Sequence, residues 1–597
     1  MIRNMFRKIA NPFLALLRTL TFALPLSFGG FTSLAQGGPG GVGTSSDNVL
    51  WLRSTEGTST TTNNNPVSAW NDISGNANHS VQTTGSLQPL FITSGINGLP
   101  TIRFDGIDDF LMVPDADNLD NTLGLSIFVV AQPNTPDSQP RGLVSKRVNY
   151  NSERSYSLFT YTSSYLYFDA GTNRINGSHA VTDQPQIFSA VFNGAVPNPR
   201  STLYYNGEES GSGNGPTSIG NTASNLHIGI LNEGYAQGFR GDISEIIIYR
   251  KALNAAERVV VENYLSSRYD ITLGDNYYTN STYNYDVVGI GTTDGIIKHS
   301  KTTSSGGGIL LRELATSLNN TNEFVFAGHD GAVTTEVTTD LPTLDDGSLT
   351  GRSQRVWYIQ KTTTGSIDVS IGFELSKTGL GEGDENQIFY LLFRSGTSGT
   401  FSTVSNAQGV LVNGEVWFSV SDVDLVNGYY TIARSDKKGR TWYSYQSGPW
   451  DDPLTWTLDA SGDFVNDELL TPTTSPTAFS DRVVIKSPYL VTVTSDIIKN
   501  ALLDVRLGGT VDFGTTTGHI FSTIIGDGTI KLSADNFPDG DASGFADASL
   551  GGTVEYYGAT SYELSSPRTF RNMIINMDDP AHRVTLLANY TINGSLT

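Results

Sequence analysis

Short runs of apolar and β-branched residues, bounded by Gly, Asn and Pro, recur along most of the chain. Runs of about four to eight such residues between turn formers are typical of β-strands. They predict one β-rich domain over residues 47–275 and a second over residues 276–435. In the second domain, residues 367–371 alternate apolar and polar positions, as a half-buried antiparallel strand does. The pattern therefore predicts an all-β, multidomain protein.

One segment departs from this pattern. Residues 242–249 are a β-branched run, and residues 254–269 then place apolar side chains at helical spacing. Asn254, followed by Glu257 three residues later, has the arrangement of a capping box. The buried stripe of this helix is predicted from two i,i+4 pairs, Val260 with Tyr264 and Val261 with Leu265. A lone helix after many strands indicates the end of a domain.

A third region, residues 436–597, consists of short strands separated by Gly and Asp turns. Residues 508–514 recur as residues 551–558, because both stretches place a glycine pair before a strand that carries an acid. A repeat at a separation of 43 residues predicts a β-solenoid with two coils per repeat. Residues 590–597 have the pattern of a further strand without a cap, so we expect either a longer natural protein or a fragmentary gene product.

The first 35 residues have the three parts of a secretory signal peptide. They carry four basic residues and no acid, then an apolar run, and a small-residue cleavage site that ends at Ala35. Arg18 and Pro25 leave fewer than about 18 uninterrupted apolar residues, so no transmembrane segment is expected. The glycine-rich residues 36–46 have little to bury and are predicted to be a flexible leader.

Two motifs at opposite ends of the first domain resemble a known family. The run Phe104-Asp105-Gly106-Ile107-Asp108-Asp109-Phe110 is similar to an early turn of the LamG-like, concanavalin A-like domains of secreted bacterial proteins. Residues 242–269 look like the last strand and closing helix of the same domains. The resemblance implies a jelly-roll sandwich over residues 47–275. Because that family contains binders, enzymes and scaffolds alike, function must be argued from sites.

The two later regions also resemble known modules. Residues 276–435 are similar to an uncharacterised, β-sandwich-like domain that commonly follows the LamG-like domain in surface proteins of the Bacteroidota. The third region begins with Trp442, Trp450 and Trp456, which resembles the start of right-handed β-helices in bacterial adhesins. These resemblances imply a secreted or cell-surface protein.

Composition narrows the choice of partners. The net charge is −22, and loss of the basic signal peptide makes it more negative. Such a charge disfavours nucleic acid and anionic lipid and favours divalent cations. Because the chain contains no cysteine, disulfides, thiolate catalysis and Cys-ligated metals are excluded.

Two acidic stretches are candidate Ca²⁺ sites. Asp105, Asp108 and Asp109 fall in a tight turn where carboxylate oxygens can converge on a hard cation; the alternative is a solvated hairpin. Three further acids match positions of the twelve-residue calcium loop: Asp539, Asp541 and Asp547. Position 12 of that loop is Leu550 and no flanking helices are expected, so the EF-hand interpretation fails and a plain turn or an isolated calcium loop is left.

Sugar binding needs exposed aromatic rings beside polar groups. The candidates are Tyr161, Tyr165 and Tyr235, with Tyr150 and Tyr167; the alternative is that these rings fill the sandwich or stiffen its strands. For hydrolysis, the glucanases of the resembling fold carry Glu-x-Asp-x-x-Glu on one strand, whereas only Glu245 stands at that place here. The seven histidines are dispersed, and no serine-nucleophile or zinc-protease motif occurs.

These observations favour a secreted or cell-surface, non-catalytic binding or adhesion protein whose LamG-like domain binds a glycan or an extracellular protein. Two alternatives stay open at this point. One is a glycoside hydrolase of the same fold, and the other is a purely structural surface spacer.

Overall fold

The protein is described here by a computed structural model, which covers residues 37–597 apart from residues 121–122, 135, 151, 163, 233–237, 305, 315–316, 345–348, 384–386, 459–471, 479–480 and 547–550. The predicted signal peptide, Tyr235 and Asp547 lie outside the described residues. Among the described residues, no helix has the length and apolar character needed to cross a membrane.

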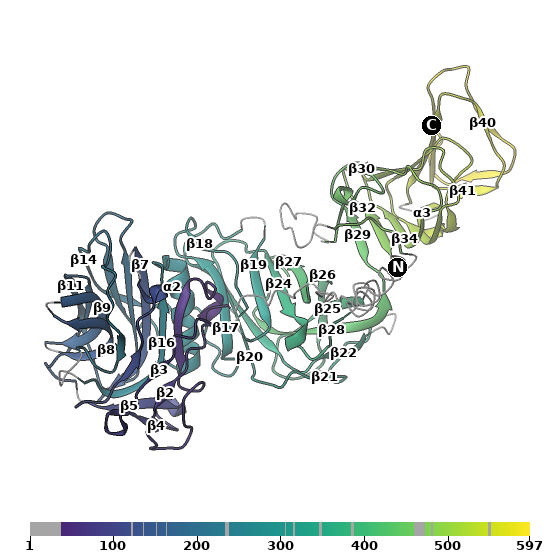
Figure 1. Ribbon diagram of the computed structural model, residues 1–597. Coiled ribbons are helices and arrows are strands. Elements are labelled where there is room, and N and C mark those ends of the chain that lie inside the picture. Colours follow the sequence, from purple (N-terminus) through teal and green to yellow (C-terminus); the bar gives the residue numbers. More distant parts are fainter. Residues whose placement is uncertain are drawn as a thin grey trace, which may run out of the picture. The chain divides into compact units, whose positions relative to one another are not determined.

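The first domain is a sandwich of two antiparallel sheets (Figure 1). The first sheet has the order β14 (Glu208–Gly213), β13 (Ser201–Tyr205), β12 (Gln186–Asn193), β7 (Gly124–Pro133), β16 (Arg240–Tyr249), β5 (Thr101–Asp105) and β4 (Leu90–Ile92), with β1 (Asn48–Arg53) also paired to β16. The second sheet has the order β11 (Asn173–Ala180), β10 (Tyr165–Ala170), β9 (Ser152–Tyr161), β8 (Arg141–Asn149), β15 (Leu226–Ile228), β6 (Leu111–Val113), β3 (Ser80–Val81) and β2 (Ala69–Trp70).

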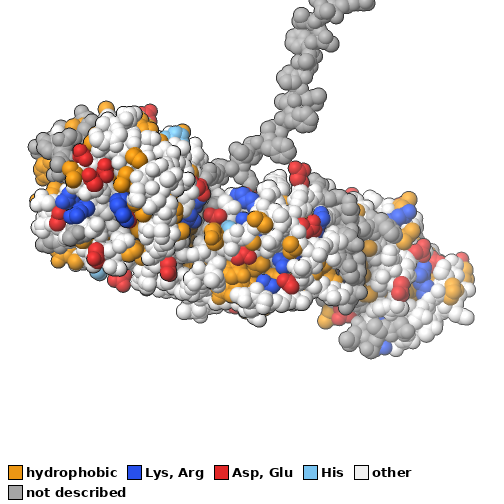
Figure 2. Space-filling model, turned by 90° about the horizontal axis from the view of Figure 1, so that it is seen from below, with side chains coloured by type: hydrophobic (Ala, Val, Ile, Leu, Met, Phe, Trp, Pro, Cys, Tyr) orange, Lys and Arg blue, Asp and Glu red, His pale blue; other side chains and the backbone are white. Residues whose placement is uncertain are grey.

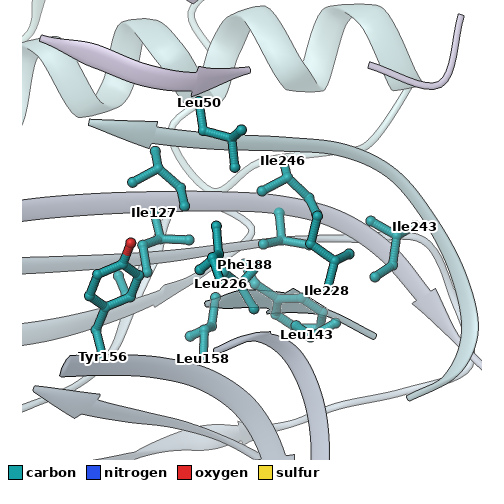
Figure 3. Packing of buried hydrophobic residues seen from close by; sticks show 14 of the residues in the cluster. Leu50, Ile127, Leu143, Tyr156, Leu158, Phe188, Leu226, Ile228, Ile243 and Ile246 are labelled. Atoms are coloured by element: carbon teal, nitrogen blue, oxygen red, sulfur yellow. The ribbon is translucent and has the colours of Figure 1, made fainter. Parts of the chain in front are cut away.

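The core of the sandwich forms because alternate residues of each strand point inward. Ile127 and Ile246 from the first sheet meet Leu158 and Leu226 from the second, all with 0% exposure (Figure 3). On β9, Tyr156 and Leu158 belong to this core, so Ser157 and Phe159 lie on the opposite, outer face of the second sheet. That outer face carries Tyr161, Tyr165 and Tyr167, three of the tyrosines that the sequence singled out.

The predicted helix is α2 (Ala255–Tyr269), and its capping box is present, with Asn254 and Glu257 bonded to each other's backbone N–H. The helix stands between the last strand of the sandwich, β16, and the first strand of the second domain, at the predicted end of the first domain. It lies in an apolar cluster between the outer side of the first sheet, which contributes Phe128, and the second domain, which contributes Phe326 (Figure 1). The helix is therefore buried on most of its sides and joins the two domains.

The second domain is a strongly curved sheet with its own core. Its strand order is β18 (Lys298–His299), β17 (Tyr285–Thr292), β20 (Glu323–His329), β23 (Trp357–Thr362), β28 (Gly428–Lys438), β25 (Gln387–Arg394), β26 (Ser402–Val412), β27 (Glu415–Val420), β24 (Val369–Glu374) and β19 (Ile309–Glu313). In addition, β22 (Leu349–Ser353) pairs with β28, and β21 (Glu336–Val337) pairs with β22. Val288 from one end of this order and Ile371 from the other share one buried cluster. The sheet thus folds over itself, in agreement with the predicted sandwich-like domain.

The predicted flexible leader is instead packed from Gly37 onward. Its 3₁₀ turn η1 (Pro39–Gly41) is buried, and Val42 is 0% exposed beside α2. Gly37 N–H donates to the carbonyl of Ser304 (2.6 Å), and Thr303 N–H donates to that of Gly41 (2.9 Å). The glycines that indicated flexibility are needed for close approach, since a Cβ atom on Gly41 would lie 2.8 Å from Thr302 Cβ. We call residues 37–44 the N-terminal latch.

The third region is the predicted β-solenoid, with two sheets stacked coil on coil whose strands pair in parallel, apart from the antiparallel pair β29–β31. One sheet has the order β31 (Trp456–Thr457), β29 (Thr441–Ser444), β32 (Arg482–Ile485), β34 (Lys499–Val505), β36 (Ile520–Ile525) and β38 (Asp539–Asp541). The other has the order β30 (Gly448–Pro449), β33 (Leu490–Thr492), β35 (Thr510–Asp512), β37 (Thr529–Leu532), β39 (Thr553–Gly558) and β42 (Asn572–Met577). Four short strands pair as β40 (Tyr562–Leu564) with β43 (Val584–Leu586) and β41 (Arg568–Phe570) with β44 (Tyr590–Ile592).

The sequence repeat spans two coils, as predicted. β35 and β39 carry the two copies, and β37 lies between them in the sheet. Val511, Ile530 and Val554 stack at matching positions with 0% exposure, so one apolar column runs through successive coils.

Candidate functional site

Three of the predicted tyrosines share the outer face of the second sheet. Tyr161 on β9 pairs directly with Tyr165 on β10, and Tyr167 follows two positions later, so all three project to one side. The rings of Tyr161 and Tyr167 lie 5.7 Å apart, and Tyr167 stacks on Phe159 with a centroid separation of 5.6 Å. The three tyrosines are half-buried. We call Tyr161, Tyr165 and Tyr167 the tyrosine row.

An arginine cluster adjoins this row at Phe159. Arg147 on β8, Arg154 on β9 and Arg174 on β11 meet around the Phe159 and Tyr150 rings. The guanidinium of Arg174 lies 5.0 Å from the centroid of Phe159 and 5.3 Å from that of Tyr150. Tyr150, the residue that follows β8, is 55% exposed. The fourth predicted tyrosine therefore lies in the arginine cluster.

Asp169 neutralises part of this cluster. Its two carboxylate oxygens accept from Arg174 Nε (2.7 Å) and Nη2 (2.8 Å), and Oδ2 also accepts from Arg147 Nη1 (2.8 Å). Burial, together with the charges of Arg174 and Arg154, lowers the pKa of Arg147 to about 10, whereas Asp169 acts in the opposite direction. On the face drawn in Figure 2, Lys and Arg side chains are scattered over a surface that is mostly uncharged.

Asp105, Asp108 and Asp109 do come together, in the turn between β5 and β6. One oxygen from each lies within 4.8 Å of the others, and no other such group of three acids or histidines occurs in the described part of the chain. Oxygens on opposite sides of a Ca²⁺ ion, each about 2.4 Å from it, are about 4.8 Å apart, so the spacing suits that cation. We call these residues the Asp turn.

Hydrogen bonds within the Asp turn also fit the hairpin alternative. Asp105 Oδ1 accepts from the backbone N–H of Ile107 (2.7 Å), and Asp109 Oδ2 accepts from that of Asp105 (3.0 Å). Asp109 is 8% exposed, and burial together with the charges of Asp105 and Asp108 raises its pKa to about 6. Arg141 Nη1 donates to the carbonyl of Gly106 (2.8 Å), which connects the turn to the first residue of β8.

The second acidic stretch has the features of a surface turn in its described part. Asp539 and Asp541 are exposed on β38. Asp541 Oδ1 accepts from the backbone N–H of Ser543 (3.0 Å), the first residue of the short helix α3 (Ser543–Ala546).

Glu245 is a structural residue in the interior. It is 0% exposed and accepts hydrogen bonds from Trp51 Nε1 (2.7 Å), the Tyr264 hydroxyl (2.9 Å) and the Tyr269 hydroxyl (2.8 Å). Two of these partners come from α2, so Glu245 fastens the helix to the first sheet. A sugar cannot reach this carboxylate, although its sequence position is that of the glucanase motif.

The sequence did not single out the arginines, because residues 141–149 were not predicted to be a strand. A signal was present: Arg141, Lys146, Arg147, Arg154 and Arg174 concentrate basic residues within a strongly acidic chain. Only the pairing of β8 with β9 and of β10 with β11 shows that three of them meet.

Two family models match the chain. Residues 105–257 match the concanavalin A-like lectin/glucanases superfamily, and residues 257–429 match a domain of unknown function, DUF8202. The chain therefore contains a concanavalin A-like domain, followed by a domain of unknown function and a C-terminal β-solenoid. The match to the second model begins within α2, which agrees with the joining role of that helix. A comparison with curated proteins finds no match.

Solved structures similar to parts of the chain include domain 4 of an extracellular GH43 arabinanase from Geobacillus stearothermophilus in complex with arabinotriose (14% identity, TM-score 0.26, 36% of this chain and 97% of that one). Another is the binding domain of Paraclostridial Mosquitocidal Protein 1 (13% identity, TM-score 0.29, 65% of this chain and 97% of that one). For a sialidase of Trypanosoma rangeli, at 13% identity and a TM-score of 0.27, the match covers 36% of this chain but only 32% of the enzyme. Similarities at this level carry no information on function.

Proposed function

We propose that this is an exported, surface-associated binding protein whose concanavalin A-like domain holds a glycan on the tyrosine row without cleaving it. The observation that carries the proposal is the row itself: three half-buried tyrosines on the outer face of the second sheet, with Tyr161 in tilted contact with Tyr167 and Tyr167 stacked on Phe159. Such rings offer an apolar face to a sugar ring, while their hydroxyls remain available for hydrogen bonds.

A non-catalytic role is supported by the position of the acids. Glycoside hydrolysis needs two accessible carboxylates about 5–9.5 Å apart. Glu245 is buried and bonded to its neighbours, and Asp169 is 1% exposed and paired with arginines. The signal-peptide pattern of residues 1–35 and the net charge of −22 support export. Ca²⁺ at the Asp turn completes the proposal, as a structural ion.

The test combines binding and turnover by the full chain. On a glycan array, we expect Tyr161→Ala with Tyr167→Ala to weaken binding about tenfold, that is by ~1.4 kcal/mol. Tyr285→Ala is the matched control, because this tyrosine is 51% exposed but belongs to the second domain. Binding that survives the double substitution would place the ligand elsewhere. Release of reducing sugar by the wild type, above that of a heat-inactivated sample, would show an enzyme, and binding to no glycan would favour a structural spacer.

A further inference from the structure

Among the described side chains, the arginine cluster holds more positive charge than the neighbouring acids neutralise. Arg147 and Arg154 are direct partners across β8 and β9, an arrangement that like charges make unfavourable. Asp169 is the only carboxylate among the described side chains that forms an ion pair with any of the three guanidinium groups. In a chain of net charge −22, a local excess of positive charge indicates a site that attracts an anion.

The cluster has guanidinium N–H groups that remain available to a ligand. Arg174 uses Nε and Nη2 on Asp169, and the exposed Tyr150 ring lies beside its guanidinium. Arg154 donates Nε and Nη2 to the carbonyl of Gly171 and Nη1 to that of Tyr150, which fixes its plane 4.7 Å from the Tyr150 ring. A guanidinium has five N–H donors, so each arginine keeps hydrogens beyond these bonds. Arg147, 2% exposed, lies beneath them and adds charge without being accessible.

The cluster is also continuous with the tyrosine row. Tyr161 contacts Tyr167, Tyr167 stacks on Phe159, and Arg174 lies over Phe159 at 5.0 Å. A chain of sugar units on the tyrosines would thus extend to Arg174 and Arg154. Planar guanidinium groups bind carboxylate and sulfate with paired hydrogen bonds.

We propose that the arginine cluster selects an acidic polysaccharide, by binding a carboxylate or sulfate group of a glycan chain that lies on the tyrosine row. This inference rests on the proposed function and adds the chemical class of the ligand. Arg174 and Arg154 contact the anion, and the buried Arg147 attracts it electrostatically. The Tyr150 ring lies between Arg174 and Arg154.

The experiment measures binding of the full chain to two matched pairs: polygalacturonate with its methyl ester, and dextran sulfate with dextran. The wild type should bind one acidic member at least tenfold more tightly than its neutral partner, and the pair that shows this identifies carboxylate or sulfate. Arg174→Gln and Arg154→Gln should each remove most of that preference. Arg200→Gln is the control, since this arginine bonds to the carbonyl of Val196, next to β13 of the other sheet. Added salt should weaken wild-type binding more than that of the Gln variants.

The outcomes separate this inference from the proposed function. Equal binding of acidic and neutral members, still lost with Tyr161→Ala and Tyr167→Ala, overturns the acidic ligand and leaves the tyrosine row in place. An acidic preference that both Gln variants retain also overturns it. Binding to none of these glycans, nor to any on the array, overturns the proposed function and the inference together. If Arg174→Gln does not fold, Arg174→Lys and Tyr150→Ala replace it, with at least a threefold loss of the preference expected for each.

Discussion

At the scale of single residues, two buried carboxylates of the first domain have opposite surroundings: hydrogen-bond donors face one, and further acids face the other. Glu245 accepts three hydrogen bonds, and its Oε2 lies 3.7 Å from Arg268 Nε, so its charge is compensated. Asp109 faces two further acids, and its pKa of about 6 reflects that environment. The sequence identified the Asp turn correctly as a group of three acids. It could not show that Glu245 is inaccessible, because an acid within a β-branched run has the same pattern whether a helix covers it or not.

The pKa of Asp109 gives a signed prediction. Because the folded value (about 6) is above the ordinary value of 3.8, the folded state holds the proton more tightly. Protonation of Asp109 therefore adds to the free energy of unfolding, by at most about 3 kcal/mol. This contribution is fully present below about pH 4 and is lost as the pH rises through 6. At neutral pH, a bound cation would offset the repulsion between the ionised Asp109 carboxylate and the two neighbouring acids. In chelator at pH 7.5, Asp109→Asn should raise the melting temperature of the full chain.

Calcium should then act only on the wild type. Ca²⁺ at a hundredfold excess over Kd stabilises by about 2.7 kcal/mol, which raises the melting temperature of the transition that includes the sandwich by about 3 °C if the first two domains unfold as a unit. Asp109→Asn should lose most of this shift, while Asp539→Asn, an exposed acid of the solenoid, should keep it. A wild-type melting temperature that is the same in chelator and in millimolar Ca²⁺ would leave the Asp turn as a plain hairpin.

At the scale of elements, the sequence was most informative where apolar residues alternate or repeat. It located β16 and α2 to within a few residues. It missed β8 because Lys146 occupies an inward position of that strand, where it is 0% exposed and bonds to Asp115 (2.5 Å) and to the carbonyls of Thr222 and Ser224. Its partners lie far along the chain, so no local pattern could indicate that a lysine belongs in the interior. The arginine cluster was missed for the same reason.

The sequence predicted a flexible leader where the structure has the N-terminal latch, because glycine occurs both in flexible segments and where two backbone segments pack closely. Gly41 has φ +78° and faces Thr302, so Gly41→Val adds both backbone strain and overlap. We expect the free energy of unfolding of the first two domains to fall by about 2–4 kcal/mol, seen as a lower urea midpoint. Gly85→Val is the control, since nothing lies within 4 Å of a Cβ atom there. Equal midpoints for the two variants would mean that the latch contributes nothing to stability.

For the whole molecule, the arrangement of cores determines which parts unfold together. β7 contributes Ile127 to the core of the sandwich and Phe128 to the cluster around α2. β20 likewise contributes Phe326 to that cluster and Val325 to the core of the second domain. The first two domains are thus linked through strands that each serve two cores. Among the described residues, those that form the solenoid core all lie from 442 onward.

Calorimetry of the full chain should therefore show two transitions rather than one for each of three domains. Phe326→Ala removes a ring that is 0% exposed, and a loss of about 3–5 kcal/mol should lower the transition of the first two domains as a unit. Val554→Ala, an equally buried position of the solenoid, should lower the other transition alone. Because the Asp turn belongs to the sandwich, the transition that Phe326→Ala lowers should also be the one that Ca²⁺ raises. If Phe326→Ala lowers a transition that Ca²⁺ does not move, the sandwich and the second domain unfold independently, and α2 is a contact between them rather than a shared core.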